Sequence, residues 1–471
     1  MPIHSTSHAS FLDRIGFGER PRRTVRLPAG MVYGVNDCPP LTVSLFAGLQ
    51  WVGLINVYLV YLLVLTREGH VPQATVVAMI GLSMLGLGAA TLLQALPRGP
   101  VGSGYFCPAV LSANYLGPSL SAIKLGGLPL MCTMTVFAGL FEVLLAPFAR
   151  RLKHLFPMEI AGLVVFLIGL SVGLIGVRYT FAPSASTPVS STHLTVALAT
   201  FSTTVALTVW GKGTWRMLSA LIGMTVGYVA SVGSGLLTWD DLHAFGTMPV
   251  FAIPSFAHVS FAFSPAMILP FAVGALASTA KTIGLISLCQ KLNDANWREP
   301  DMDAVRRGVL ADGLGTTFAG LCGTIGINSM PSAVAIPAAT GLASRRLAYV
   351  IAMALAVLAF LPLASVALAV MPKAVMGGLT LFTGCFVLVN GLQTIASCQL
   401  DQRRTVVVGL GISGGVAAEA FPSLAEILPA CLQPLMSSSL VLGTLVAMIA
   451  NLLLLQPEIW CIRKARPSVV Q

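Results

Sequence analysis

The sequence predicts an all-α polytopic membrane protein, and three observations carry this prediction. Hydrophobic residues make up 56% of the 471-residue chain and charged residues only 9%, whereas soluble globular domains carry about 25% charged residues. Apolar blocks of about 20 residues recur along the chain, each long enough to cross a bilayer as a helix. Most Lys and Arg residues fall between these blocks. This composition excludes a large soluble enzyme.

Fourteen apolar segments are predicted, and the distribution of charge supports that number. With the N-terminal tail placed inside and the sides alternating, 22 of the 27 Lys and Arg residues fall inside. The exceptions are Arg67, Lys124, Arg178 and Lys373, which fall outside, and Lys281, which lies within a segment. The positive-inside rule therefore favours fourteen segments with both termini cytoplasmic. The predicted ranges are 43–65, 74–96, 105–123, 127–149, 158–177, 192–209, 217–237, 265–288, 307–323, 327–342, 347–371, 374–396, 405–421 and 434–455.

Two of these segments, the third (105–123) and the tenth (327–342), are short and contain Pro, Gly, Ser or Asn. Fourteen segments divide into two halves of seven, and an odd number per half gives the halves opposite orientations. Each short segment is then the third of its half. Such a matched pair indicates a transporter binding site, because broken backbone at membrane depth needs protein or a water-filled cavity around it. The alternative is a pair of poorly defined helices.

Several other function classes are excluded by what the sequence lacks. The net charge of +10 is not arranged as a basic stripe with interleaved aromatics, so nucleic acid is not expected as a partner. The nine cysteines form no CxxC pair, so a metal site or a disulfide framework is not expected. No GxSxG elbow, Walker loop or HExxH motif points to an enzyme, because the Gly-rich run "GLGISGG" at Gly409–Gly415 lies within an apolar segment. The N-terminal stretch has no apolar h-region and is interpreted as a cytoplasmic tail.

Four stretches resemble the nucleobase–ascorbate transporter family, also called nucleobase:cation symporter-2. They are "YGVNDCPPLTVSLFAGLQWV", "GSGYFCPAVLSANYLGPSL", "AKTIGLISLCQKLNDANWREPDM" with the following "RRGVLADGLGTTFAGLCGTIGINS", and "PKAVMGGLTLF". The third stretch is similar to bacterial uracil–xanthine permease-like members. The similarity covers roughly residues 20–455.

The resemblance implies two inverted repeats of seven segments, divided between a core and a gate domain. It also implies that segments three and ten form short antiparallel strands, that the protein is a homodimer, and that it works as an elevator in the bacterial inner membrane. The implied divisions are an N-tail (1–42), core parts at 43–149 and 265–371, gate parts at 158–237 and 374–455, and a C-tail (456–471). The implied activity is proton- or sodium-coupled uptake of uracil, xanthine, urate or a related base, without a cofactor.

Lys281 is the main candidate for contact with a substrate. A Lys at the centre of a membrane helix costs about 2.5–3.5 kcal/mol on insertion scales, so it needs a partner or a cavity. By the resemblance, it stands where the family usually has a substrate-binding glutamate. One turn on, where some members have a polar residue, this chain has Leu285. A structural Lys, bonding the carbonyls of a broken helix or extending to the interface, is the alternative.

The tenth segment departs from the family's signature, which has an acid or amide followed by Asn. The matching positions here begin with Ser332, and only the later Thr340 is retained. The polar groups that could contact a base edge are those of Asn328, Ser329 and Ser332, and the adjacent Pro331 interrupts the segment. Capping of a broken helix is the alternative role for these side chains.

Two further groups of candidates come from segments one and three. Gln50 matches the family's Gln in segment one, and its amide offers both a donor and an acceptor; an interhelical polar clamp is the alternative. Ser112, Ala113 and Asn114 fall where the family's strand meets the ligand. Their small side chains allow close approach of the backbone.

Carboxylates are scarce within the predicted segments. Asp312 lies in the first turn of the ninth segment, where a helix N-terminus favours negative charge, and it is also a candidate partner for Lys281. Glu142 lies within the fourth segment. Together with Thr340, these two carboxylates are candidates for ion coupling or for a structural polar role.

The leading hypothesis is a secondary transporter of a nucleobase or similar planar heterocycle. Two alternatives stay open. The same fold could carry a small organic or inorganic anion, because Lys281 replaces the family's glutamate. A channel-like protein or a sensor that has lost coupling is the third possibility.

Overall fold

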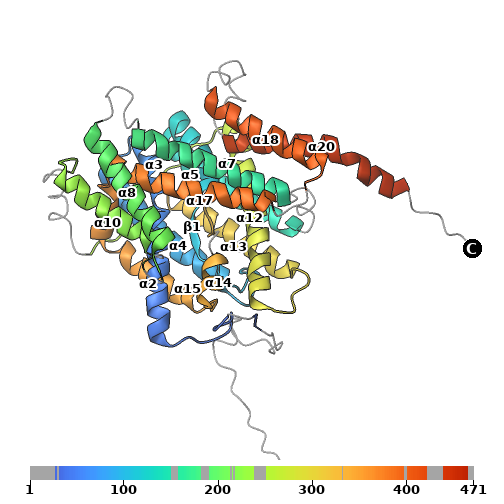
Figure 1. Ribbon diagram of the computed structural model, residues 1–471, viewed down its shortest axis with the longest axis horizontal. Coiled ribbons are helices and arrows are strands. Elements are labelled where there is room, and N and C mark those ends of the chain that lie inside the picture. Colours follow the sequence, from blue (N-terminus) through green and yellow to red (C-terminus); the bar gives the residue numbers. More distant parts are fainter. Residues whose placement is uncertain are drawn as a thin grey trace, which may run out of the picture.

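The computed structural model describes most of the chain as a helical assembly with one small sheet (Figure 1). The described residues are 27–28, 31–149, 158–181, 190–212, 215, 218–237, 251–330, 333–396, 400–421 and 439–464.

The elements up to residue 237 cover the first half of the predicted segments. They are α2 (Leu41–Val57), α3 (Val60–Glu68), α4 (Gln73–Ala95), β1 (Ala109–Leu111), η1 (Ala113–Tyr115), α5 (Leu116–Leu145), η2 (Ala146–Phe148), α7 (Met158–Phe181), α8 (Ser191–Trp210) and α10 (Ser219–Gly233).

The remaining elements cover the second half. They are η3 (Pro265–Met267), α12 (Ile268–Asn293), α13 (Met302–Leu321), β2 (Ile327–Ser329), α14 (Ala335–Thr340), α15 (Leu347–Ala359), α16 (Pro362–Ala369), α17 (Lys373–Ala396), α18 (Gln402–Ala420) and α20 (Ser439–Lys464).

Seven helical spans in the described part of the chain are long and apolar enough to cross a membrane. An eighth is added if α15 and α16, bent by 79° where Pro362 begins the second helix, are taken as one span. The predicted third and fourth segments lie partly on α5, which holds two helical stretches joined at Gly126 and Gly127. Gly127 has φ 69°, a conformation that favours glycine. The fourteen-crossing topology therefore stays a prediction.

The two short segments meet as a two-stranded antiparallel sheet. Ala109 pairs with Ser329, Val110 with Asn328, and Leu111 with Ile327. All residues of both strands are buried. The short antiparallel strands implied by the resemblance are thus present, deep among the helices.

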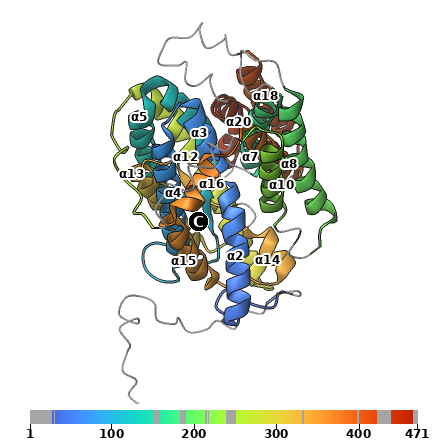
Figure 2. The ribbon, with the colours of Figure 1, turned by 90° about the vertical axis from the view of Figure 1, so that its left-hand side faces the viewer.

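The helices pack mainly into two groups, which Figure 2 shows on either side of α2. In one group, α5 packs on α12 and α13, and α4 packs on α13 and α15. In the other group, α17 packs on α7 and α8, α8 packs on α10, and α18 packs on α20. Between the groups, Leu276 and Ala280 of α12 join an apolar cluster formed by α7, α17, α18 and α20.

Helices α7 and α17 pack antiparallel along a seam of glycines spaced seven residues apart. A Cβ on Gly169 would lie 2.2 Å from the backbone nitrogen of Leu388, and one on Gly391 would lie 2.3 Å from that of Phe166. Contacts this close require glycine, because real Cβ atoms do not approach backbone to under 3 Å. The seam contains Gly162, Gly169, Gly176, Gly377, Gly384 and Gly391.

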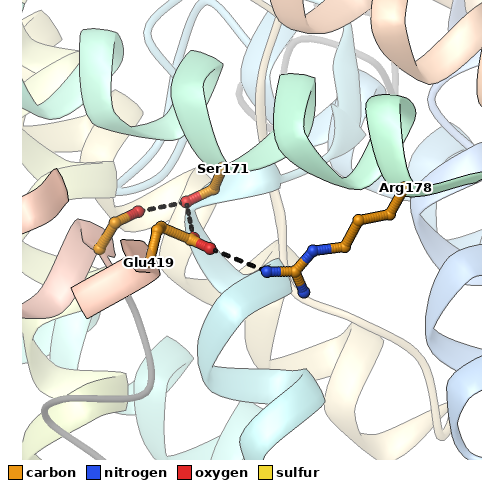
Figure 3. Close-up of polar contacts among 4 residues, drawn as sticks. Ser171, Arg178 and Glu419 are labelled. Atoms are coloured by element: carbon orange, nitrogen blue, oxygen red, sulfur yellow. Dashed lines mark hydrogen bonds and ion pairs between the residues drawn. The ribbon is translucent and has the colours of Figure 1, made fainter. Parts of the chain in front are cut away.

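Ion pairs join α7 to α18 at both ends of α7. Glu159 near its start lies 3.2 Å from Arg404, and Arg178 near its end lies 3.5 Å from Glu419. Figure 3 shows the second pair, in which Ser171 also donates to Glu419 at 3.3 Å. Ser171 is hydrogen-bonded to Ser439 at the start of α20 as well. These contacts hold α7, α18 and α20 together.

Candidate substrate-binding site

Helix α12 carries the central candidate, Lys281, on a face with other polar side chains. Residues three or four apart share a helix face, so Ser278 and Leu285 lie one turn before and one turn after Lys281. Thr282 follows directly and points towards the small sheet, as its contacts show below. Ser278, Thr282 and Leu285 are buried, while Lys281 is partly accessible.

Asp312 lies in the middle of α13 and not in a first turn as predicted, because that helix begins earlier, at Met302. It is the centre of a buried hydrogen-bond network. Its carboxylate accepts from the Thr282 hydroxyl at 2.5 Å and from the Gln94 amide at 2.9 Å. Ser329 donates to it twice, through its hydroxyl at 2.9 Å and its backbone N–H at 3.3 Å. Hydrogen bonds of this kind compensate the cost of burying the carboxylate. The network joins α4, α12, α13 and β2.

Gln94 was not predicted from the sequence, although it takes part in several of these contacts. Its amide nitrogen also donates to the carbonyl of Gly308 at 3.0 Å, and its amide oxygen accepts from the N–H of Ser103 at 3.2 Å. It lies next to the last residue of α4, where it resembles an ordinary interfacial polar residue. What distinguishes Gln94 is that its side chain is buried in an apolar helix, and this burial is known only from the structure.

Asn328 connects β2 to the Lys281 face of α12. Its side-chain nitrogen donates to the hydroxyl of Ser278, to the carbonyl of Ser278 at 3.4 Å and to the hydroxyl of Thr282 at 3.3 Å. The backbone around it is held by the strand pair with Val110. The sequence did not indicate Ser278 or Thr282, which here resemble helix-packing residues.

The segment after β1 places Ser112, Ala113 and Asn114 beside α12. The N–H of Ser112 donates to the carbonyl of Gly326 at 2.8 Å, and its hydroxyl accepts from the N–H of Asn114 at 3.3 Å. Ser112 therefore caps the 3-10 turn η1 that Ala113 begins. Asn114 is buried, and a Cβ on Gly274 of α12 would lie 3.2 Å from its carbonyl oxygen.

Glu142 of α5 lies fully buried next to the same region. It accepts a hydrogen bond from the hydroxyl of Tyr115, which directly follows Asn114. Its second oxygen has no partner among the described residues. An unpartnered oxygen of a buried acid is costly, so this group is suited to binding a proton or a cation.

Gln50 lies on α2 beside an aromatic pair. The next residue, Trp51, packs edge-to-face on Phe106 with ring centroids 5.1 Å apart. Phe106 precedes β1, so this pair brings α2 to the approach of the small sheet. The side-chain nitrogen of Gln50 is buried without a hydrogen-bond partner in the described structure.

Lys281 directly precedes Thr282, whose hydroxyl donates to Asp312. The expected ion pair with Asp312 is not formed, because no described carboxylate lies within ion-pair distance of the ammonium. The physical reason is that Thr282, Ser329 and Gln94 already occupy both oxygens of Asp312.

The other predicted residues lie outside this network. Leu285 is buried and apolar. Thr340 is exposed, and its hydroxyl donates to the carbonyl of Ile336 in its own helix at 2.9 Å. Pro331 and Ser332 lie outside the described residues.

The arrangement as a whole offers polar atoms that no described residue satisfies. They are a side-chain nitrogen on each of Gln50 and Asn114 and an oxygen on each of Asn328 and Glu142. Buried polar groups in proteins are nearly always paired. Unpaired amides beside two interrupted segments therefore fit a small ligand that offers both hydrogen-bond acceptors and donors.

Comparison with known proteins gives consistent matches. The family model for xanthine/uracil permeases, described as "Permease family", matches residues 43–424. A putative purine permease of Clostridium perfringens is 27% identical over 427 residues, covering 90% of this chain and 93% of the relative. The xanthine permease XanQ of Escherichia coli is 26% identical over 441 residues, covering 90% of this chain and 94% of the relative. The uric acid transporter UacT of Escherichia coli is 26% identical and covers 77% of this chain and 76% of its own length.

Solved structures with a similar fold are more distant in sequence. The transmembrane domain of the cyanobacterial bicarbonate transporter BicA matches with a TM-score of 0.50 and 16% identity, over 85% of this chain and 97% of that one. The murine anion transporter Slc26a9 matches with a TM-score of 0.58 and 13% identity, over 97% of this chain and 77% of that one. At this identity the likeness concerns the fold alone.

Proposed function

This chain belongs to the xanthine/uracil permease family, and we propose on that basis that it transports a nucleobase or a related planar heterocycle such as uracil, xanthine or urate. It is a multi-pass membrane permease and not an enzyme. The relatives named for purine, xanthine and uric acid transport support this class of substrate.

The observation that carries the proposal is the polar network where β1, β2 and α12 meet. Asn114 and Asn328 each offer an unpaired polar atom there, beside the partly accessible Lys281. A base edge presents alternating N–H and C=O groups, which amide side chains complement. Interrupted membrane segments at matching positions of the two halves are a recurrent position for transporter sites.

Uptake of labelled uracil, xanthine and urate into proteoliposomes tests the proposal. We expect at least one base to be taken up and Asn328→Ala to abolish that uptake. Asn296→Ala is the matched control, because Asn296 is exposed in the loop that follows α12. Absence of uptake of every base by folded protein would contradict the proposal.

Coupling to H⁺ or Na⁺ is part of the proposal, with no other cofactor. The buried Glu142, with one oxygen unpartnered among the described residues, supports a group that binds a proton or a cation. Accumulation of a base above equilibrium only under a proton or sodium gradient would establish symport. Equilibration without a gradient would contradict it.

An elevator movement of a core domain against a gate domain is proposed as the mechanism. The division of the helices into two packed groups supports it, and so does the apolar contact of Leu276 and Ala280 with the second group. Cysteine pairs across this contact, cross-linked with and without base, test whether the two groups move relative to one another.

Assembly and orientation complete the proposal. A homodimer in the bacterial inner membrane follows from the family resemblance, and mass measurement in detergent tests it. Cytoplasmic termini are supported by the excess of Lys and Arg in the predicted inside segments. Labelling of cysteines added at either terminus from one side of the membrane tests the orientation.

Transport of a small inorganic anion is the second candidate function. It is favoured by one observation, the absence of an ion-pair partner for Lys281 in the described structure. Uptake of labelled bicarbonate or sulfate, with no uptake of any base, would establish it in place of the first.

A further inference from the structure

Lys281 has no hydrogen-bond or ion-pair partner among the described residues. Its ammonium group has three N–H donors and no acceptor. The polar side chains nearest to it on α12 are already engaged, because Ser278 and Thr282 both accept from Asn328. No described residue therefore uses the donors of Lys281, and they can bind an acceptor on a substrate.

The two buried carboxylates around this part of α12 form no ion pair with Lys281 in the described structure. Asp312 accepts four hydrogen bonds from neutral donors on Gln94, Thr282 and Ser329. Glu142 accepts from Tyr115 with one oxygen, and its other oxygen has no partner in the described structure. Neither carboxylate forms an ion pair with Lys281 among the described residues, so neither satisfies its N–H groups.

Lys281 also has space beside it. Its side chain is partly accessible, although the flanking Ala280 and Thr282 are buried. One turn on, a Cβ added to Gly284 would meet no atom within 4 Å. This open side of α12 adjoins the boundary between the two helix groups, where Ala280 meets the apolar cluster.

The unpaired amides near α12 add to this pattern. Asn114 presents an unpartnered side-chain nitrogen, which is a donor, and Asn328 presents an unpartnered oxygen. The assignment for Asn328 is fixed by its nitrogen, which donates to the carbonyl of Ser278. Among the described residues, the unpaired acceptors here are the Asn328 oxygen and one oxygen of Glu142. The three N–H groups of Lys281 and the side-chain amide N–H groups of Asn114 outnumber them, and the strongest donor carries a positive charge.

We infer that Lys281 is a specificity-determining residue and that it selects planar heterocycles in their anionic form over neutral ones. This inference rests on the proposed function and narrows its substrate class. The ammonium can form a charge-assisted hydrogen bond to either form of a heterocycle, but only the anionic form adds the Coulomb attraction between opposite charges. The ring anion would accept from the ammonium, and a ring N–H would donate to the oxygen of Asn328.

The test compares the binding of two purines to the purified full-length protein by calorimetry at neutral pH. Urate is a monoanion under these conditions, and hypoxanthine is neutral. We expect Lys281→Gln to weaken urate binding about tenfold or more and to change hypoxanthine binding less than about threefold. Lys281→Arg keeps the charge and is expected to retain the preference for urate. Lys291→Gln is the matched control, because Lys291 is exposed in the last turn of the same helix.

A comparison without variants guards against misfolding of Lys281→Gln. The wild type is expected to bind 5-nitrouracil, which is ionised near neutral pH, more tightly than neutral uracil. The inference would be overturned if Lys281→Gln weakened the binding of urate and of hypoxanthine equally. It would also be overturned if the wild type bound hypoxanthine more tightly than urate, or uracil more tightly than 5-nitrouracil. Either result would leave the proposed function standing. Binding of no base by folded wild type would overturn both.

Discussion

Ser329 bonds to Asp312 through both its side chain and its backbone. The hydroxyl donates to one carboxylate oxygen at 2.9 Å, and the N–H donates to the other at 3.3 Å. The last residue of β2 is thereby fixed to α13, and the same carboxylate reaches α12 through Thr282. The position of the strand end relative to α12 depends on this one acidic side chain.

Asp312→Asn should therefore impair both stability and transport. The substituted amide turns one acceptor into a donor, which faces either Thr282 or Ser329. We expect the free energy of unfolding to fall by about 1–3 kcal/mol, measured as a lower melting temperature in detergent, and base uptake to be lost. Asp303→Asn is the control, because Asp303 is exposed in the first turn of the same helix. Equal melting temperatures and equal base uptake of the two variants would show that neither stability nor transport needs the network.

Gln94→Leu should be similarly destabilising, because it keeps the volume and removes the amide. The carbonyl of Gly308 and the N–H of Ser103 would each lose a partner inside the protein, at about 1–3 kcal/mol for an unpaired buried group. Thermal unfolding measures the loss. Gln73→Leu, at an exposed position at the start of α4, is expected to stay within about 0.5 kcal/mol of wild type. An unchanged melting temperature for Gln94→Leu would count against the contacts described.

Glu142→Gln tests ion coupling. The amide oxygen still accepts from Tyr115, so the fold is expected to hold, but the group no longer ionises. We expect gradient-driven accumulation of base to fall about tenfold or more, while exchange without a gradient continues. Glu68→Gln is a close control, because Glu68 accepts from Tyr179 at an exposed position. Unchanged accumulation in Glu142→Gln would assign Glu142 a structural role.

Gly169→Ala and Gly173→Ala form a matched pair on α7. A Cβ at Gly169 would lie 2.2 Å from the backbone of Leu388, whereas one at Gly173 would meet nothing within 4 Å. We expect Gly169→Ala to destabilise the protein by about 1–3 kcal/mol through overpacking. Gly173→Ala should be neutral or slightly stabilising, because alanine favours the helix. Equal melting temperatures would contradict the close seam.

The two ion pairs of α7 should differ in strength. Arg178 has a side chain that is 63% exposed, and its pair with Glu419 is expected to contribute about 0.2–1 kcal/mol. The side chain of Glu159 is only 4% exposed, so Glu159→Gln should lower the melting temperature more than Glu419→Gln. Raising the salt concentration should weaken the Arg178 pair first. The reverse order of the two variants would contradict this assignment.

Much of the architecture follows from apolar block length and charge placement. The resemblance to the family is confirmed by the family model, and each predicted range overlaps a helix or a strand-and-helix unit of the structure. The break within α5 was expected between 123 and 127 and occurs at Gly126 and Gly127. Block length and charge placement do not show which of these segments cross the whole bilayer, because some of the helices are short or bent.

The polar network was harder to predict, for a physical reason. Gln94, Ser278 and Thr282 are common in membrane helices, and their partners are more than thirty residues away or on another element. Nothing local distinguishes them from packing residues. Lys281 was recognisable because a charge in an apolar helix is costly. Its lack of an Asp312 ion pair depends on four neutral donors, from three residues, that only the fold brings together.

The glycine seam determines where this molecule can deform. At Gly169 and Gly391 the backbones of α7 and α17 lie too close for any side chain between them, so we expect these two helices to move together. The side chains of Leu276 and Ala280, by contrast, meet their neighbours through smooth apolar surface without hydrogen bonds of their own. If the proposed elevator movement occurs, this apolar contact is where the two helix groups would slide, and Lys281 lies directly next to it in α12.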